Sequence, residues 1–391
     1  MTQRISVAFA NMFDPIWLAG TQYLYNLLFA IKLNDIPIDP VLRVSTDTPR
    51  SYYAVLNGLF KRVIEYPHAA PTWGNDLSQR VIRKLIPLLH NEDALLRRYR
   101  VDAQFVWLDP GKATRIPAIC WIPDFQHLHY PEYFTTQELD FRSNFYPDSA
   151  RKAKLVVLSS QQVLNDFTGV VPDMVYKARI LHFVAQVAPE VYEHDSEGIS
   201  RHYSLPDKFF FLPNQFWQHK NHLLVIKALA LARKNFPDIA VVCSGGIHDY
   251  RNPSFFDEIL QEIARLGIQA NIHILGKLPR NHFWQLARRS LAVIQPSFFE
   301  GWSTSVEEVK SLGKTILLSD IPVHREQNPP AAYYFNPNDT AKLASVMQGL
   351  YEAKDPGPEF ELENQSRIAL PERTRLFATA FYEIVRDAVE K

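Results

Sequence analysis

The sequence has few cysteines, and this excludes two classes of protein. Cys120 and Cys243 are the only two among 391 residues, and each lies within an apolar run. Two isolated cysteines cannot build a disulfide framework or a cysteine-based zinc site. We therefore expect a protein that does not depend on cross-links and that suits the reducing cytoplasm.

An excess of charge of either sign and long hydrophobic runs are also missing. Lysine plus arginine and aspartate plus glutamate each number 42, so the formal net charge is zero, and we expect no nucleic-acid partner. No apolar run approaches the roughly 20 residues that a transmembrane helix needs. The chain passes at once into a strand-like segment at residues 5–10, so we expect no signal peptide. These features predict a cytoplasmic protein, either free or on the inner face of the membrane.

The chain has enough apolar material for two cores. Hydrophobic residues make up 47% of the sequence, which predicts two domains at this length. Short apolar runs alternate with helical patterns, which is typical of an α/β fold with parallel sheets covered by helices. We expect a boundary in the loop-like residues 187–206, an N-terminal domain over 1–190, a second over 205–370 and an amphipathic helix over 371–391.

The expected elements alternate along both halves of the chain. Strands are expected at residues 5–10, 41–44, 104–108, 118–121, 155–158, 209–212, 239–243, 272–275, 291–294 and 315–318. Helices are expected at residues 21–32, 76–89, 91–99, 160–167, 222–234, 253–266, 279–289 and 305–312.

The most informative segment is residues 294–327, IQPSFFEGWSTSVEEVKSLGKTILLSDIPVHREQ. A loop carrying Glu300, a glycine and three hydroxyl groups precedes the N-terminus of an expected helix there. A helix N-terminus favours anions, and hydroxyl and carboxylate groups bind polyols. This combination predicts a ligand with an anionic group and many hydroxyls, such as a sugar nucleotide.

The same segment resembles a known family. Glu300, seven intervening residues, Glu308, then Gly313 and Ser-Asp-Ile-Pro-Val-His-Arg-Glu at residues 319–326 resemble the donor-site segment of retaining glycosyltransferases of family 4, the group 1 type. The resemblance is specific over about residues 209–327 and weak in the N-terminal half. It implies the GT-B fold, in which two Rossmann-like doubly wound domains face a central cleft and the last helix crosses back to the N-terminal domain.

The resemblance also implies an activity. Such enzymes move a hexose, mannose among the candidates, from a nucleotide-diphosphate sugar to a hydroxyl of a glycan or lipid-linked acceptor, with retention at the anomeric carbon. They generally need no cofactor and no metal, and the sequence contains no Asp-x-Asp motif of the metal-dependent type. Two alternatives stay open: a GT-B nucleotide-sugar epimerase or hydrolase, and a non-catalytic protein that binds nucleotide sugars.

Carried over residue by residue, the resemblance assigns Glu300 to the transferred sugar and Glu308 to the nucleotide ribose. The alternative for Glu308 is a capping box with Ser305, in which its carboxylate only satisfies helix N–H groups. Ser303 and Thr304 are expected to touch the diphosphate or the sugar, or else to cap the helix N-terminus.

A second constellation is residues 212–221, LPNQFWQHKN, between an expected strand and helix. Lys220 matches the family lysine that binds the donor diphosphate. Asn214 and Gln215 stand where many relatives carry an arginine, so Asn214 is expected to act as a neutral donor. The alternative for Lys220 is an ordinary solvated lysine.

Two loops of the N-terminal half complete the expected site. Gly20 lies in the expected loop 17–23 and matches a family glycine that approaches the donor sugar, although it can equally serve only the backbone conformation. After the strand at 118–121, many members carry His-Asp near the reacting carbon. Here Pro123 replaces the histidine and Asp124 is kept, so we expect Asp124 and His127 to serve this function, against the alternative of ordinary loop residues.

Two weaker signals remain. Residues 244–246 and 276–277 follow expected strands, where the carboxyl ends of parallel strands form a ligand crevice, and the resemblance implies that such loops frame the base. Cations mix with apolar residues at Arg80, Arg83 and Lys84 and again at Arg97, Arg98 and Arg100. This mixture fits docking on an anionic membrane, and it fits equally well a helix surface above a core stripe.

Overall fold

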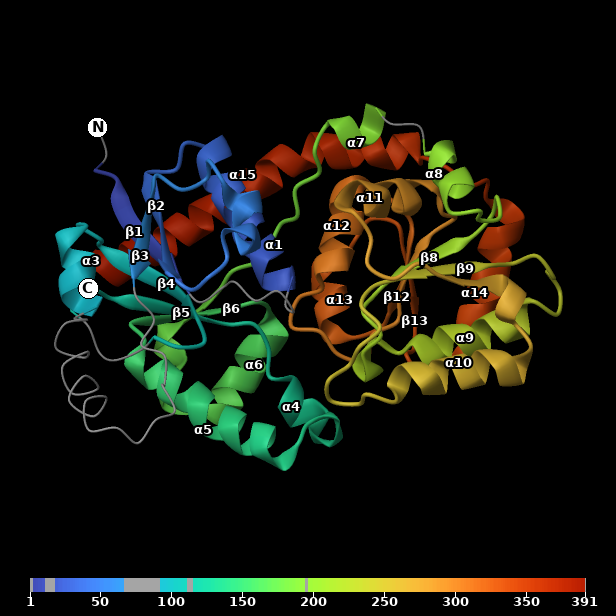
Figure 1. Ribbon diagram of the computed structural model, residues 1–391, viewed down its shortest axis with the longest axis horizontal. Helices are drawn as coiled ribbons and strands as arrows, with labels where there is room; N and C mark the ends of the chain where they lie inside the picture. The colour runs from blue at the N-terminus through green and yellow to red at the C-terminus, as the bar shows by residue number, and fades with distance from the viewer. Residues whose placement is uncertain (1–2, 11–17, 67–91, 111–114, 194–195, 391) are drawn as a thin grey trace.

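The computed structural model describes residues 3–10, 18–66, 92–110, 115–193 and 196–390. These residues form two lobes, each built around one parallel sheet (Figure 1). The expected helix at residues 76–89 lies outside the described residues. Among the described helices, none is both long and apolar enough to cross a membrane.

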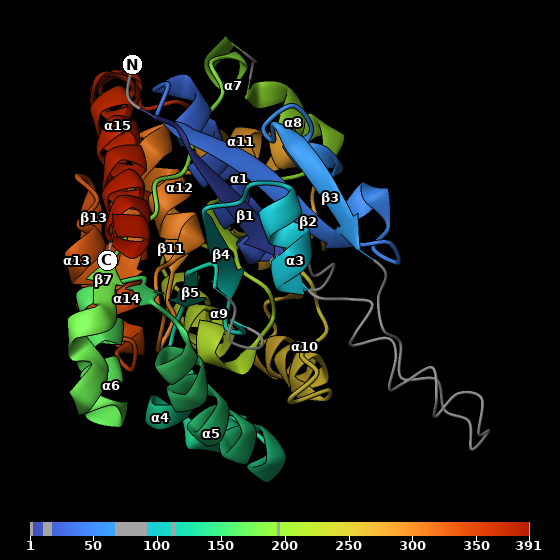
Figure 2. The same ribbon diagram turned by 90° about the vertical axis from the view of Figure 1, so that its left-hand side faces the viewer.

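The first sheet has seven parallel strands in the order β3-β2-β1-β4-β5-β6-β7. Its strands are β1 (Ile5–Ala10), β2 (Ile38–Ser45), β3 (Arg62–Tyr66), β4 (Ala103–Trp107), β5 (Ala118–Ile122), β6 (Leu155–Leu158) and β7 (Ala178–Ile180). Its helices include α1 (Leu18–Leu33), α3 (Glu92–Arg98), α4 (Gln126–His129), α5 (Thr136–Lys152) and α6 (Gln161–Val170). Helices α4 and α5 lie at the bottom of the side view (Figure 2).

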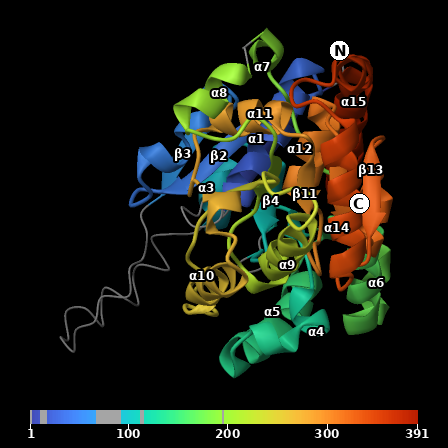
Figure 3. The same cartoon turned by 90° about the vertical axis from the view of Figure 1, so that its right-hand side faces the viewer.

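The second sheet has six parallel strands in the order β10-β9-β8-β11-β12-β13. Its strands are β8 (Phe210–Pro213), β9 (Val241–Ser244), β10 (Ile272–Ile274), β11 (Val293–Gln295), β12 (Ile316–Ser319) and β13 (Ala332–Phe335). Its helices include α9 (His222–Ala232), α10 (Phe255–Leu266), α11 (Arg280–Arg289), α12 (Thr304–Leu312), α13 (Pro322–Gln327) and α14 (Thr340–Ala353). Figure 3 shows α10 and β13 at opposite sides of this lobe. Both strand orders are of the doubly wound type, which confirms the expected fold class.

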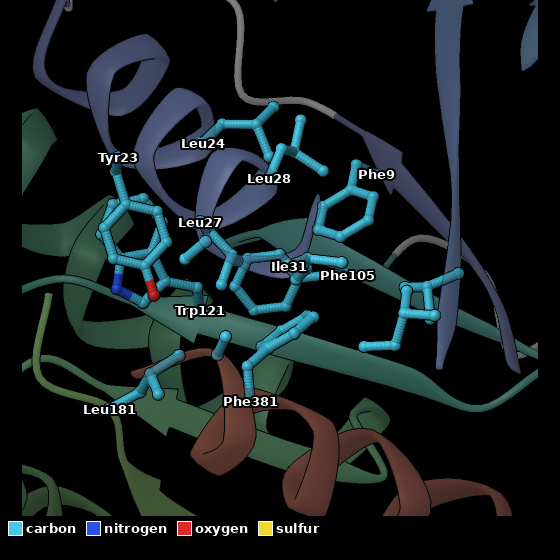
Figure 4. Close-up of a cluster of buried hydrophobic side chains, with 14 of the residues drawn as sticks. Phe9, Tyr23, Leu24, Leu27, Leu28, Ile31, Phe105, Trp121, Leu181 and Phe381 are labelled. Carbon is cyan, nitrogen blue, oxygen red and sulfur yellow. The ribbon is translucent and has the colours of Figure 1, made fainter. Parts of the chain in front are cut away.

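Apolar side chains cover both faces of each sheet. Along β8, Phe210 and Leu212 enter one core while Phe209 and Phe211 enter the other, as the two-residue period of a strand requires. In the first lobe, the ring of Tyr23 stacks on Trp121 with centroids 4.0 Å apart, in the core under α1 (Figure 4). Both faces of each sheet are therefore buried, as in other parallel sheets.

The last helix joins the two lobes. It was expected to begin at Pro371, but α15 runs unbroken over Phe360–Glu390 and passes through that proline (Figure 1). Its first part contacts the second lobe through Glu363, whose carboxylate pairs with Arg288 at 2.8 Å. Its second part places Phe377 and Phe381 in the core of the first lobe. Packing against both lobes outweighs the one helix hydrogen bond that a proline removes.

The connection between the lobes also differs from the expected loop. Residues 187–206 contain two short helices, α7 (Glu190–Glu193) and α8 (Glu197–His202). Val191 and Ile199 from these helices pack in a core of the second sheet. The segment that connects the lobes therefore packs against the second lobe.

Candidate functional site

The central contact of the site joins two loops at the carboxyl ends of β8 and β11. Lys220 ends a short 3-10 helix after β8, and Glu300 lies between β11 and α12. Lys220 Nζ is 2.6 Å from Glu300 Oε1, and the side chains are 18% and 10% exposed. The same loops are tied by the backbone, because Phe298 N donates to His219 O at 2.9 Å. The two residues that were assigned separate roles thus form one ion pair.

A buried amide network lies behind this pair. Asn214 Nδ2 donates to Gln295 Oε1, and Gln295 Nε2 donates to Ser303 Oγ at 2.8 Å and to Ser305 Oγ at 2.6 Å. Gln295 was not singled out in the sequence, although its place at the end of an apolar strand marks it as an unusual buried polar residue. Asn214 thus donates to Gln295, which in turn donates to two serine hydroxyls, so the loop before α12 is held in a fixed shape.

The network corrects the capping alternatives. Helix α12 begins at Thr304 with Ser303 at the N-cap, and the Ser303 side chain makes no capping hydrogen bond. Ser305 lies inside the helix, and its hydroxyl accepts from Gln295. The capping box expected as an alternative for Glu308 is therefore wrong, because its first member does not occupy the N-cap position.

Glu308 makes an ion pair instead. Arg280, the first residue of α11, has Nη2 at 2.6 Å from Glu308 Oε1. Arg280 was also not singled out in the sequence. The only signal for it was its position just after Gly276-Lys277, at the carboxyl end of an expected strand.

The two lobes meet at Gly301. A Cβ atom added to this glycine would lie 2.1 Å from Pro123 O and 2.8 Å from Asp124 Cβ. Asp124 follows β5 of the first lobe, and its Oδ1 accepts from Gln126 N at 3.0 Å. Only glycine permits this approach, so the structure brings Asp124 beside the Glu300 loop. Asp124, Glu300 and Lys220 thus come from both lobes to one place.

Comparison with known proteins connects this geometry to a family. Residues 199–365 match the sequence family described as glycosyl transferases group 1. This part of the chain is therefore similar to group 1 glycosyltransferases. It contains the Lys220–Glu300 pair and the Arg280–Glu308 pair.

Relatives extend the comparison to the whole chain. The O-antigen chain mannosyltransferase RfbU of Salmonella typhimurium is 25% identical over 177 residues, which are 42% of this chain and 48% of that protein, so the match spans about half of this relative. Anabaena HepE in complex with UDP and glucose matches with a TM-score of 0.65 at 15% identity, over 99% of this chain and 98% of that one. A glycosyltransferase from Rickettsia africae ESF-5 gives 0.66 at 15% identity, over 100% of both chains. These likenesses show that the chain has the GT-B fold.

Three buried histidines lie near Lys220 in the second lobe. Burial, reinforced by the charge of Lys220, lowers the pKa of His219, and burial lowers the pKa of His222 to about 3. Burial also lowers the pKa of His324 to about 4. His324 Nδ1 donates to Ser319 O at 2.9 Å. Neutral imidazoles therefore line this part of the domain near neutral pH, and none of the three was singled out in the sequence.

His127, on the other side of the site, lies in an aromatic pocket of the first lobe. Its ring contacts Tyr146 with centroids 5.4 Å apart, and Phe125 and Phe134 at slightly longer distances. Burial is the main cause that lowers its pKa to about 4. The neighbouring His129 instead contacts Phe299, with centroids 4.9 Å apart, on the Glu300 loop of the second lobe. The catalytic role of His127 stays a prediction.

Gly20 was expected in a loop, but α1 begins at Leu18, so this buried glycine lies in the first turn of a helix. Much of the expected loop 17–23 is thus helical, and Trp17 lies outside the described residues. The role of Gly20 near the donor sugar stays a prediction.

The prediction for the basic segment can be compared with the structure only in part. Arg80, Arg83 and Lys84 lie outside the described residues, whereas Arg97 and Arg98 end α3. Both interpretations of this basic segment stay open. Across the described ranges, no group of three or more histidine, cysteine or acidic side chains is arranged to hold a metal ion.

Proposed function

We propose that this protein is a retaining glycosyltransferase that moves a hexose from a nucleotide-diphosphate sugar to an acceptor hydroxyl in glycan or polysaccharide assembly. The observation that carries the proposal is the Lys220–Glu300 ion pair, 2.6 Å long, on a loop that presses against Asp124 of the other lobe. A cation, a carboxylate and a loop of the facing lobe thus lie close together, which supports the proposal.

Lys220 is proposed to hold the leaving diphosphate. An ammonium group has three N–H donors, so one can remain on Glu300 while the others bind phosphate oxygens. Stabilising negative charge as it develops on the leaving group lowers the barrier of group transfer. The α12 N-terminus, with Ser303 and Thr304, supplies further N–H groups to the same anion.

Glu300 and Glu308 are proposed to bind the two ends of the donor. Glu300 accepts hydrogen bonds from hydroxyl groups of the transferred sugar. Asp124 lies beside the Glu300 loop, and His127 is predicted to contribute to the same site. Glu308 accepts hydrogen bonds from the ribose hydroxyls. A carboxylate can accept from two neighbouring hydroxyl groups at once, which fits both tasks.

The reaction is proposed to proceed with retention and without a metal. The bond between the anomeric carbon and the diphosphate oxygen breaks as the sugar gains oxocarbenium character. The acceptor hydroxyl bonds to the same face of that carbon, and its proton passes to the departing phosphate oxygen, so no protein nucleophile is required. The name of the Salmonella relative, an O-antigen chain mannosyltransferase, supports mannose as the first sugar to test.

The first experiment measures thermal shifts of the full chain with UDP-, GDP-, ADP- and dTDP-sugars. A donor at about 100 times its Kd stabilises the folded protein by ~2.7 kcal/mol. We expect one base to be preferred and Glu308→Ala to abolish that shift, while Glu352→Ala, an exposed carboxylate on α14, leaves it unchanged. An unchanged nucleotide Kd in Glu308→Ala would show that the ribose assignment is wrong.

The second experiment follows the preferred donor by NMR with glycan and lipid-linked acceptors. Retention predicts that the product has the anomeric configuration of the donor. Donor consumption at an equal rate without acceptor would favour a hydrolase or epimerase. Donor binding without any turnover would favour a non-catalytic nucleotide-sugar-binding protein.

A further inference from the structure

Arg280 lies beside Glu308, a contact that its position in the sequence does not predict. Its guanidinium pairs with Glu308 at 2.6 Å, yet the two side chains differ in exposure: 40% for Arg280 and 6% for Glu308. The carboxylate is therefore enclosed, whereas the cation that partners it still reaches solvent.

Two aromatic rings of α11 fix the position of the guanidinium. The Arg280 Cζ atom lies 4.3 Å from the ring centroid of Trp284 and 4.8 Å from that of Phe283. Both rings are buried, so they form a rigid support. A guanidinium has five N–H donors in one plane, and it can hold Glu308 with one edge and donate to a ligand with another.

Arg280 lies near two loops at the carboxyl ends of β9 and β10. Gly245 N, after β9, donates to Gly276 O, after β10, at 2.8 Å. A Cβ atom on Gly246 would lie 3.3 Å from Lys277 Cε, so these two loops are in close contact. Arg280 follows the second of these loops along the chain, and its ion pair with Glu308 connects this loop to α12. In doubly wound sheets, this end of the strands is where nucleotides bind.

We propose that Arg280 is a positioning residue for the nucleoside half of the donor, a ribonucleoside diphosphate. It pairs with the enclosed Glu308 carboxylate and aims it at the two ribose hydroxyls, because a buried carboxylate without a cation is costly. Its open edge donates to oxygen atoms of the nucleoside. The inference rests on the proposed function, since it assumes that Glu308 binds ribose.

The test measures the Kd of GDP and UDP, and of their 2′-deoxy analogues, for the full chain by calorimetry. Arg280→Ala is expected to weaken the preferred ribonucleotide about tenfold or more and to reduce its advantage over the 2′-deoxy form, as Glu308→Gln does. Arg280→Lys, which keeps the charge, is expected to recover part of both. The double variant is expected to lose less affinity than the sum of the two single losses, because Arg280 acts partly through Glu308. Arg375→Ala, at an exposed pair on α15, is the control.

The outcomes separate this inference from the proposed function. If Glu308→Gln reduces affinity but Arg280→Ala changes neither Kd nor the preference for ribose, Arg280 is only a tether between α11 and α12, and the inference is overturned. If Glu308→Gln changes nothing, or if no nucleoside diphosphate of the donor panel binds, the donor site assigned above is wrong, and the inference falls with it.

Discussion

Lys220 Nζ lies 2.6 Å from Glu300 Oε1 and joins a loop of β8 to a loop of β11. This pair places the proposed phosphate-binding cation against the proposed sugar-binding carboxylate. Each charge is largely enclosed, so each depends on the other for its stability.

Replacing Lys220 with methionine is expected to lower kcat about 100-fold or more, because the charge that stabilises the departing diphosphate is lost. The measurement is the initial rate of sugar transfer at saturating donor. Lys227→Met changes an exposed lysine on α9 and is expected to keep the wild-type rate. A Lys220→Met protein with an unchanged kcat would contradict the assignment of the leaving-group cation.

Gly301→Ala is expected to disturb the meeting of the two lobes. The new methyl group would lie 2.1 Å from Pro123 O, so the two loops must separate. We expect the transfer rate to fall about tenfold or more, since small misplacements of reacting groups are costly. Gly349→Ala, in α14, meets no atom within 4 Å and is expected to stabilise the protein by about 0.5–1 kcal/mol. Equal activity of both variants would show that the contact of Gly301 with Pro123 does not matter for transfer.

His324 is expected to lower the free energy of unfolding at acidic pH. Its pKa falls from the ordinary 6.5 to about 4 through burial, so between these values the unfolded chain binds a proton that the folded chain does not. Folding stability is therefore fully present above about pH 6.5 and falls as the pH drops toward 4, by about 1.4 kcal/mol per pH unit for this group. His324→Phe is expected to reduce the slope of unfolding free energy against pH by that amount, measured by urea denaturation. His248→Phe, at an exposed histidine, is expected to leave the slope unchanged, and an equal slope in His324→Phe would contradict the prediction.

Phe381→Ala tests the anchoring of α15 on the first lobe. The ring is fully buried, with its centroid 5.1 Å from that of Phe105 (Figure 4). Removing it is expected to cost about 3–5 kcal/mol of unfolding free energy, measured by urea denaturation. Leu376→Ala, half exposed on the same helix, is expected to change stability by no more than about 0.5 kcal/mol. Similar losses in both variants would show that this part of α15 does not anchor the lobe.

Several elements were predictable because they carry strong local patterns. Strands β1, β6 and β12, each with a neighbour on both sides, are short apolar runs between turn residues, and such runs identify buried parallel strands. Strands β3, β7 and β13 were missed. All three lie at sheet edges, where one side of the strand has no neighbour, so their sequences are shorter or more polar.

The sequence by itself determined an α/β fold with parallel sheets covered by helices, because strand and helix periods are local properties. The resemblance of residues 209–327 to a known family placed Glu300, Glu308 and Lys220 in one expected site. Only the tertiary structure decided which charges pair. Arg280 meets Glu308 from a helix that begins 28 positions earlier, and Asp124 meets Gly301 from the other lobe. Such contacts depend on how two sheets place the ends of their strands, and no spacing along the chain records that placement.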